Sequence, residues 1–489
     1  MVSLNNFYNK NKKCITISAK IVYIVAFIVA ILFVGSKHEH WADEAQAWLI
    51  ARDLSLLDII KFIRYEGTPP LWHIILKIFI VCGGKYNQLI FLTTFFSVLG
   101  IVYLFKNESI PVLIKILLPF TYFIFFQYTI VARSYVLIFP VLMYILYIYP
   151  NKEKHLIKYA ISLILLMNIS SHTFLIAAGL WLEFFLQERK EFKKNNQKDW
   201  KKITFFIVMA IALLIVVIVS FPPLDGGYIP GSSLSFYRII SESMFTSADN
   251  PILVGIGVIL FFIVIGGSFM DYNNMTKGLL LLFPNLVWIC CVNGSGWHAG
   301  ILFLLVIFIT TLTNSFKKVK FLYFIMILSM IIQIYWSCRS SINDVKYRYA
   351  VGEDVKNYLE EIGYKDNKII GVDFWAIQVN PFFDKNIYCN FNNSFVNWKK
   401  VFFKEYSSKK ILDSEIEYDI YVIPCYQFKY NKDFEYYKNS NAYYEVALME
   451  KIYNSGKYHY KYFEGNIYYK DKIYESTSLY VFVKDKSEE

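Results

Sequence analysis

The sequence predicts a polytopic α-helical membrane protein with a small α/β domain at its C-terminal end. Of its 489 residues, 56% are hydrophobic and only 18% are charged. The apolar residues gather in blocks of about 15–20, close to the length of helix that crosses a hydrocarbon core of roughly 30 Å. After Cys338 the chain becomes polar and rich in tyrosine. These observations separate a membrane part, residues 1–338, from a polar part, residues 339–489.

The membrane part contains about eleven apolar spans. They lie at residues 16–35, 87–105, 110–127, 133–150, 156–170, 172–187, 202–221, 251–269, 277–293, 297–314 and 320–337. The first span follows a lysine-rich arm and is longer than the apolar part of a typical signal peptide, so we expect a retained anchor. Residues 70–83 are apolar too, but about 14 residues suit a re-entrant or interfacial segment better than a full span.

Basic loops predict the orientation of the spans. The N-terminal arm, residues 187–202 and residues 314–320 are rich in Lys and Arg, as cytoplasmic loops are. If these segments face the cytoplasm, the first outer loop (36–86) and everything after 338 lie outside. Counting 70–83 as a span would instead place 187–202 outside. The same loops account for the formal charge of +11 without nucleic-acid binding.

The polar part predicts a small extracytoplasmic α/β domain at residues 339–489. A helical pattern covers Gly352–Ile362, and strand-like runs cover Lys368–Phe374, Tyr418–Ile423 and Ser478–Val483. A disulfide between Cys389 and Cys425 is possible on sequence grounds, although the spacing gives it little support. The chain has no Cys-x-x-Cys pair and no Cys/His spacing typical of a metal site.

With this topology, polar side chains from five separate places in the sequence fall at the outer ends of the spans. They are Asp43, Glu44, Arg64, Glu66, His73, Arg133, His172 and His298. Carboxylates beside a membrane are costly unless they are paired or used, so their convergence predicts a site at the outer leaflet. The simpler interpretation is that loop residues are polar because they meet water.

Two segments of the first outer loop carry the acids. Asp43 and Glu44 begin a helix-like run in which one acid can face a cavity while the other caps or pairs. Either can serve as a general base if burial and a nearby Arg tune its pKa. They are equally well explained as acids favoured by the helix dipole. Glu66 precedes Gly67 and the rigid Pro69-Pro70 pair. This turn would hold the Glu66 side chain in a fixed position, or it is simply the start of the next helix.

The basic side chains suggest phosphate binding. Arg133 begins a span, and its guanidinium fork matches the oxygens of a phosphate group. The alternative is that its side chain extends to the lipid headgroups. His172 and His298 sit at span ends, where a single His is more often structural. His38 and His40 suggest a metal, but two His two residues apart on an irregular segment are a weak signature. We therefore expect no metal ligands and no certain cofactor, and a divalent metal is not favoured.

The order of these features resembles the GT-C superfamily of membrane glycosyltransferases, and within it the bacterial relatives of protein O-mannosyltransferases and lipid A aminoarabinose transferases. The likeness rests on Trp41-Ala42-Asp43-Glu44-Ala45, on Glu66–Trp72 (EGTPPLW) and on Arg133-Ser134-Tyr135. In the order of its spans and loops, the likeness covers about residues 15–340. The amino acids themselves match only in these three short segments. A later outer acidic pair like the one used by metal-dependent members is missing from the sequence, which favours a metal-independent mechanism.

The resemblance implies transfer of a sugar from a polyprenyl-phosphate carrier to a lipid, polysaccharide or protein of the cell envelope. It makes Asp43 and Glu44 the catalytic candidates. The substrate-binding candidates are Arg64, Glu66, His73, Arg133, Tyr135, His172 and His298. Two alternatives remain open: a transporter or flippase of lipid-linked glycans, and a non-catalytic membrane scaffold that presents residues 339–489. The expected location is the cell membrane, with the N-terminus in the cytoplasm.

Overall fold

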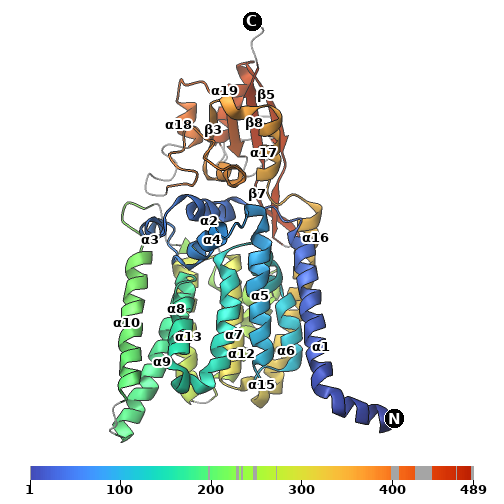
Figure 1. The fold of residues 1–489 in the computed structure, drawn as a ribbon, viewed down its shortest axis with the longest axis vertical. Helices are drawn as coiled ribbons and strands as arrows, with labels where there is room; N and C mark the ends of the chain where they lie inside the picture. Colours follow the sequence, from blue (N-terminus) through green and yellow to red (C-terminus); the bar gives the residue numbers. More distant parts are fainter. Residues whose placement is uncertain are drawn as a thin grey trace.

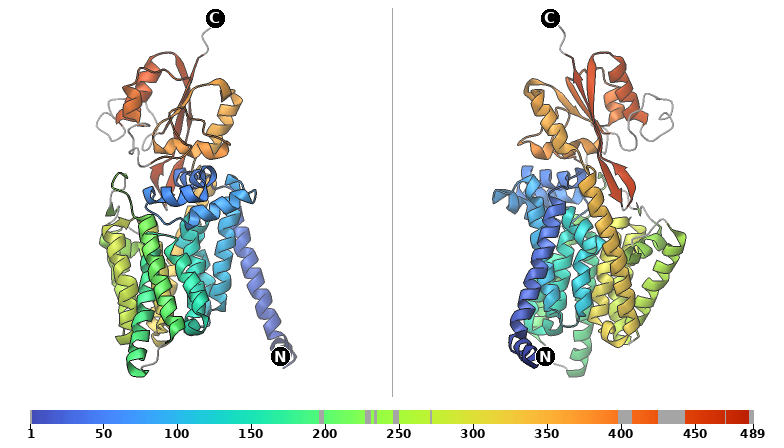
Figure 2. Two further views of the ribbon diagram at one scale, coloured as in Figure 1. Left: turned by 60° about the vertical axis from the view of Figure 1, so that its left-hand side comes forward. Right: turned by 90° about the vertical axis from the view of Figure 1, so that its right-hand side faces the viewer.

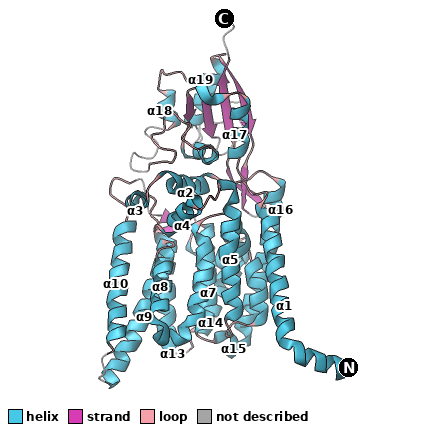
Figure 3. Cartoon of the chain, viewed as in Figure 1, coloured by secondary structure: helices cyan, strands magenta, loops and turns pink. Residues whose placement is uncertain are grey.

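The protein consists of a helical bundle that carries a small domain of strands and short helices on one end (Figure 1). The structure is a computed structural model that describes residues 2–195, 199–226, 231–232, 235–245, 250–270, 272–397, 407–424, 443–469 and 471–485. Two further views show the same arrangement, and the longer strands all lie in the small domain (Figures 2 and 3).

The bundle is built from helices of very different lengths. Their bounds are α1 (Val2–Gly35), α2 (Ala42–Asp53), α3 (Leu56–Phe62), α4 (Leu71–Val81), α5 (Leu89–Lys106), α6 (Val112–Leu117), η4 (Phe123–Ile130), α7 (Ile138–Ile148), α8 (Leu156–Met167), α9 (Ser171–Asn195), α10 (Trp200–Ser220), α11 (Phe236–Phe245), α12 (Pro251–Ser268), α13 (Tyr272–Cys291), α14 (Ala299–Leu312), α15 (Ser315–Lys318) and α16 (Lys320–Lys346). The core lies around α14, which is buried from Ala299 to Thr311 and packs against α7, α11, α12 and α13.

The structure confirms a predominantly helical part with several long apolar helices, as expected of a membrane protein. Within the described residues, seven segments are long and apolar enough to cross a membrane: Ile17–Gly35, Tyr86–Lys106, Ser134–Met167, Trp200–Ser220, Pro251–Ser268, Asn274–Cys291 and Lys320–Lys346. Val112–Phe120 and Phe123–Ile130 make an eighth if they form one span bent by 41°. The count of eleven stays a prediction. It also included residues 172–187 in α9, whose C-terminal half is charged, and residues 297–314 in the short helix α14.

Helix α4 covers most of the segment that the sequence marks as too short to span. It has 11 residues and lies with α2 across the domain end of the bundle (Figure 1). Gly67, with a φ of 63°, makes the tight turn before it, and Pro69 and Pro70 lead directly into the helix. Helices α2 and α4 pack against each other, so the first loop forms a compact layer between bundle and domain.

The small domain is built on a four-stranded mixed sheet with the order β3-β4-β8-β5. Strand β3 (Ile369–Gly371) runs parallel to β4 (Ile420–Pro424), and β8 (Leu479–Lys484) lies antiparallel between β4 and β5 (Tyr458–Phe463). The other elements are α17 (Gly352–Glu361), η9 (Phe374–Phe382), α18 (Ser408–Leu412), α19 (Tyr443–Asn454) and the hairpin of β6 (Asn466–Tyr469) and β7 (Lys472–Ser476).

The sequence located α17, β3, β4 and β8 but did not single out β5, the β6–β7 hairpin or α19. These missed segments are dominated by Tyr and Lys, so their apolar alternation is weak. Cys389 is exposed and free, and the pairing considered for it falls on Cys425, which lies outside the described residues. A further two-residue pair, β1 (Gly231–Ser232) with β2 (Asn293–Gly294), lies within the helical part.

The boundary set at residue 338 falls inside α16, which continues to Lys346. The hydropathy drops there because Ser340, Ser341, Asn343 and Asp344 follow, yet these polar side chains are buried. They are covered where the domain and the first loop meet the bundle. The domain therefore begins as the direct continuation of a membrane helix, not after a flexible linker.

Contacts between α2 and η9 hold the domain on the first loop. Arg52 donates hydrogen bonds to the backbone carbonyls of Asn380 and Phe383. The Trp41 and Trp375 rings stack with their centres 5.3 Å apart. These contacts place residues of the domain over both ends of α2.

Two glycines in the bundle provide a matched test of this packing. A Cβ at Gly179 of α9 would lie 2.6 Å from the backbone oxygen of Leu280 in α13, whereas a Cβ at Gly255 of α12 meets no atom within 4 Å. Gly179→Ala is expected to destabilise the protein by about 1–3 kcal/mol because backbone cannot move aside cheaply. Gly255→Ala should be neutral or slightly stabilising. Thermal unfolding in detergent measures both, and equal melting temperatures would contradict the α9–α13 packing.

Candidate functional site

Asp43 and Glu44 occupy the first turn of α2, where the helix dipole favours acids. Because successive helical residues are turned by about 100°, the two carboxylates point in different directions. The side chain of Asp43 is 26% exposed, whereas that of Glu44 is fully closed to solvent. The two acids are therefore placed for different tasks.

Asp43 pairs with Arg133, the basic residue expected to bind phosphate. The distance from Arg133 Nη1 to Asp43 Oδ2 is 2.7 Å, and both side chains are 26% exposed. Arg133 lies in extended backbone between η4 and the short helix η5 (Ser134–Leu137). Its guanidinium carbon is 5.5 Å from the centre of the Tyr135 ring. The pair stays accessible to a ligand, since neither partner is buried by the chain.

A row of aromatic and imidazole rings continues from Arg133. The hydroxyl of Tyr135 lies 2.7 Å from His298 Nε2, and the rings of His298 and His172 are 4.4 Å apart. His298 Nδ1 contacts Ser295 Oγ at 2.9 Å, and His172 Nε2 donates to the carbonyl of Asn293 at 2.8 Å. Five predicted site residues thus meet in one place: Asp43, Arg133, Tyr135, His172 and His298.

Glu44 is the centre of a buried polar network. Its Oε1 accepts from His40 Nδ1 at 2.7 Å and from the backbone N–H of Ala132 at 2.7 Å. Its Oε2 accepts from the backbone N–H of Trp41 at 3.1 Å and faces His38 Nε2 at 3.4 Å. The sequence made Glu44 a catalytic candidate, and the structure shows its carboxylate buried and hydrogen-bonded on both oxygens.

His38 connects the two buried carboxylates of this network. His38 Nδ1 lies 3.0 Å from Asp344 Oδ1, so the His38 ring bridges Asp344 and Glu44. Burial alone would lower the pKa of His38, but these two carboxylates raise it well above its ordinary value. Burial alone would raise the pKa of Glu44, but His40 and His38 hold it well below its usual range. Glu44 is ionised at neutral pH.

The remaining predicted residues lie elsewhere in the first loop. Glu66 accepts a hydrogen bond of 2.9 Å from Gln46 Nε2, and Gln46 also bonds to the backbone of Val396 in the domain. Arg64 is exposed on the short helix that precedes Glu66. His73 is buried in α4, where burial lowers its pKa to about 4, so it is neutral. None of these contacts joins Arg64, Glu66 or His73 to the Asp43–Arg133 pair.

The domain supplies residues that the sequence analysis missed. The Tyr474 ring on β7 is 6.0 Å from the Trp297 ring, in an edge-to-face arrangement. The neighbouring Glu475 has its pKa raised to about 7, first by burial and then by the charge of Asp43. Since β7 follows Asp43 by more than 400 residues, no local pattern in the sequence could link the two.

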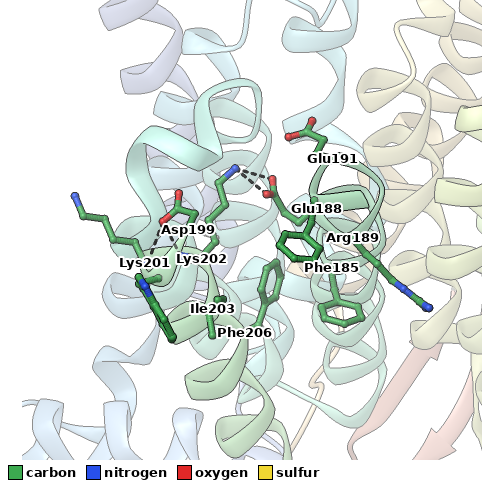
Figure 4. A pocket seen from close by; sticks show the side chains of 11 residues that line it. Phe185, Glu188, Arg189, Glu191, Asp199, Lys201, Lys202, Ile203 and Phe206 are labelled. Carbon is green, nitrogen blue, oxygen red and sulfur yellow. Dashed lines mark hydrogen bonds and ion pairs between the residues drawn. The ribbon is translucent and has the colours of Figure 1, made fainter. Parts of the chain in front are cut away.

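A cleft of about 870 Å³ lies at the opposite end of the bundle, between α9 and α10 (Figure 4). There Lys202 Nζ is 2.8 Å from Glu188 and 2.8 Å from Glu153. The carboxylates of Glu153, Glu188 and Glu191 lie close together, but Lys202 already pairs with the first two. This cleft is far along the bundle from Asp43 and belongs to the end that carries the N-terminus (Figure 1).

Comparisons of the chain with protein-family models, with curated proteins and with solved structures find no match.

Glu475 makes the stability of the protein depend on pH. Its pKa is raised from 4.5 to about 7 in the folded state, so the folded protein binds an extra proton between these values. Its stabilising contribution is full below pH 4.5 and is lost as the pH rises through 7. Relative to wild type, Glu475→Gln should gain about 1–2 kcal/mol of stability between pH 5.5 and 8.5, after allowance for solvent screening.

Thermal unfolding of both proteins across this pH range measures the effect. The exposed Glu361 provides a control, because Glu361→Gln should follow the wild-type pH dependence. Parallel curves for wild type and Glu475→Gln would show that Glu475 titrates as an ordinary surface acid.

Proposed function

We propose that the protein is a membrane glycosyltransferase that moves a sugar from a polyprenyl-phosphate carrier to an acceptor in the cell envelope, at the outer leaflet. The proposal rests chiefly on the Asp43–Arg133 pair, which sets a carboxylate and a phosphate-binding fork side by side in a partly open position. The partly exposed ring of Trp297, next to His298, offers a flat surface of the kind on which sugar rings pack.

In this mechanism Arg133 binds the phosphate of the donor. The phosphate of the donor is a diester with one negative charge, and its two free oxygens match the guanidinium fork, so it competes with Asp43 for Arg133. Asp43, released from its partner, takes the proton of an acceptor hydroxyl. The acceptor oxygen forms a bond to the anomeric carbon while the bond from that carbon to the phosphate oxygen breaks. The leaving polyprenyl phosphate keeps the electron pair and stays bound to Arg133.

An apolar groove beside α16 supports a lipid-borne donor. It has a volume of about 720 Å³ and is lined almost wholly by apolar side chains from α1, η4, α16 and the segment before η4. One end lies at Val34, Ser341 and Lys346, next to the His38–Asp344 pair. A polyprenyl chain is a flexible hydrocarbon that suits such a groove, with its phosphate toward the domain end of the bundle.

The distribution of basic segments supports the outer placement of the site. The N-terminal end of α1, the C-terminal end of α9, the N-terminal end of α10 and the short helix α15 lie at the end of the bundle away from the domain (Figure 1). They belong to the three lysine-rich segments, and such segments favour the cytoplasm. Asp43 and Arg133 lie at the other end, together with the domain.

Loss of the Asp43 carboxylate tests the catalytic step. Asp43→Asn should lower the transfer rate by about 10²–10⁴-fold because the general base is removed. The melting temperature should change little, since a partly exposed ion pair contributes only about 0–1 kcal/mol. Release of polyprenyl phosphate from a labelled donor measures the rate, and Asp58→Asn, at an exposed acid of the same loop, is the control. Wild-type activity of Asp43→Asn would remove Asp43 from this role.

Replacement of Arg133 tests donor binding separately. Arg133→Ala should raise the KM for the donor by about 10–100-fold, which corresponds to a lost charge-assisted hydrogen bond of roughly 1.5–3 kcal/mol. Arg133→Lys should keep part of the affinity because it retains the charge but loses the fork. Lys61→Ala, at an exposed base of the first loop, is the control. An unchanged donor KM for Arg133→Ala would exclude Arg133 as the phosphate ligand.

A further inference from the structure

We propose that His38, His40 and Glu44 form a binding site for one divalent transition-metal ion, with Zn²⁺ as the best match. The site lies in the linker between α1 and α2 and in the first turn of α2. It is carried by the geometry of these side chains and does not depend on the glycosyl transfer proposed above. It differs from the expectation from sequence that the chain holds no metal.

The first argument is the convergence of the donor atoms. One nitrogen of His38, one of His40 and one carboxylate oxygen of Glu44 all lie within 4.8 Å of one another. Zn²⁺ binds imidazole nitrogen and carboxylate oxygen at about 2.0–2.2 Å, so two ligand atoms of one tetrahedral ion lie roughly 3.3 Å apart. Glu44 Oε2 lies 3.4 Å from His38 Nε2, close to that value, and Glu44 Oε1 lies 2.7 Å from His40 Nδ1, which is shorter. Only small side-chain shifts would admit an ion.

The second argument is the set of groups that orient the three ligands. Asp344 contacts His38 Nδ1 with both of its oxygens, at 3.0 and 3.1 Å, and this directs His38 Nε2 toward Glu44. A carboxylate on the far nitrogen of a metal-bound His is the usual outer contact in zinc sites. Glu44 is likewise held from behind by the backbone N–H groups of Ala132 and Trp41. The ligands are therefore fixed before any ion arrives.

The third argument is charge. Two carboxylates, Glu44 and Asp344, have no exposed side-chain surface, so a compensating positive charge is required. A divalent cation held between Glu44 and the two imidazole rings would supply that charge at the centre of the cluster.

The ligand types select the class of ion. Imidazole nitrogens favour Zn²⁺ and other transition metals over Mg²⁺ and Ca²⁺, which take oxygen ligands. The carboxylate cluster of Glu153, Glu188 and Glu191 has no imidazole, and it already binds the ammonium of Lys202. Among the described residues, the His38–His40–Glu44 group is the one in which buried nitrogen and oxygen donors meet.

A metal here would act on the position of Asp43. It would join His38 and His40 of the linker to Glu44 in the first turn of α2. Asp43 is the residue directly before Glu44. Through Glu44 the metal would also fix Ala132, the neighbour of Arg133. The ion would thus lock both members of the Asp43–Arg133 pair without contacting either, which makes its ligands positioning residues.

The test measures metal on the full-length protein. Because the ligand side chains are 0–8% exposed, exchange is expected to be slow, so the protein is expressed in zinc-supplemented and zinc-depleted medium. Mass spectrometry of the purified protein should find one zinc per chain from the first and a lower content from the second. The zinc-loaded protein should melt several degrees higher, since an ion that binds only the folded state stabilises it.

Variants separate metal binding from hydrogen bonding. His40→Ala should abolish the stoichiometric zinc and the zinc-dependent rise in melting temperature. Asp344→Asn keeps all three ligands and should weaken zinc affinity by about 10–100-fold. This variant provides the test if His40→Ala does not fold. His459→Ala, at an exposed His of β5, is the control and should keep one zinc per chain.

Two results would overturn the proposal. The first is wild-type protein that carries no metal from either medium and shows no melting shift on incubation with Zn²⁺. The second is zinc content that is the same in wild type, His40→Ala and Asp344→Asn. Either result would leave the cluster as a hydrogen-bonded network in which a protonated His38 bridges two carboxylates. Bound copper, nickel or iron in place of zinc, lost in His40→Ala, would support the site and change only the ion.

Discussion

The ionised, fully buried carboxylate of Glu44 is the constraint on which the domain end of the molecule depends. A buried negative charge is tolerated only where donors surround it, and Glu44 has two backbone amides and two imidazoles. These donors come from the linker after α1 and from the segment before η5, and Asp344 adds α16 through His38. Three parts of the bundle are therefore fixed relative to one carboxylate.

This constraint explains why two adjacent acids divide their tasks. Once Glu44 is held inward, the geometry of α2 turns Asp43 toward Arg133, and the Ala132 amide bonded to Glu44 places Arg133 opposite Asp43. Removing any of the groups that surround Glu44 would leave part of a buried charge without a partner, so its position is fixed. Water reaches the ion pair of Asp43, so that carboxylate can exchange partners. Two neighbouring residues with the same chemistry thus have opposite surroundings.

The sequence predicted the parts of this arrangement that follow from local pattern. This pattern consists of the apolar spans, the lysine-rich loops and the short segment at 70–83. It was enough to predict that Asp43, Arg133, His172 and His298 lie at one end of the bundle. The pairing of His38 with Asp344 was not predictable, because the two residues are 306 positions apart and the polar residues around Asp344 look like the start of the next domain. Nor could the sequence say which of Asp43 and Glu44 faces inward, since that depends on the Ala132 amide.

The domain after α16 is part of the candidate site and not only attached to it. The rigid passage of α16 to Lys346 and the Trp41–Trp375 stack fix its position over α2. From that position the β6–β7 hairpin reaches the bundle, where the Tyr474 ring contacts the Trp297 ring. There the charge of Asp43 helps to raise the pKa of Glu475. An acid with a pKa of about 7 beside the proposed base changes the local charge near neutral pH. In the proposed reaction, an acceptor that approaches Asp43 would therefore meet surfaces of both parts of the chain.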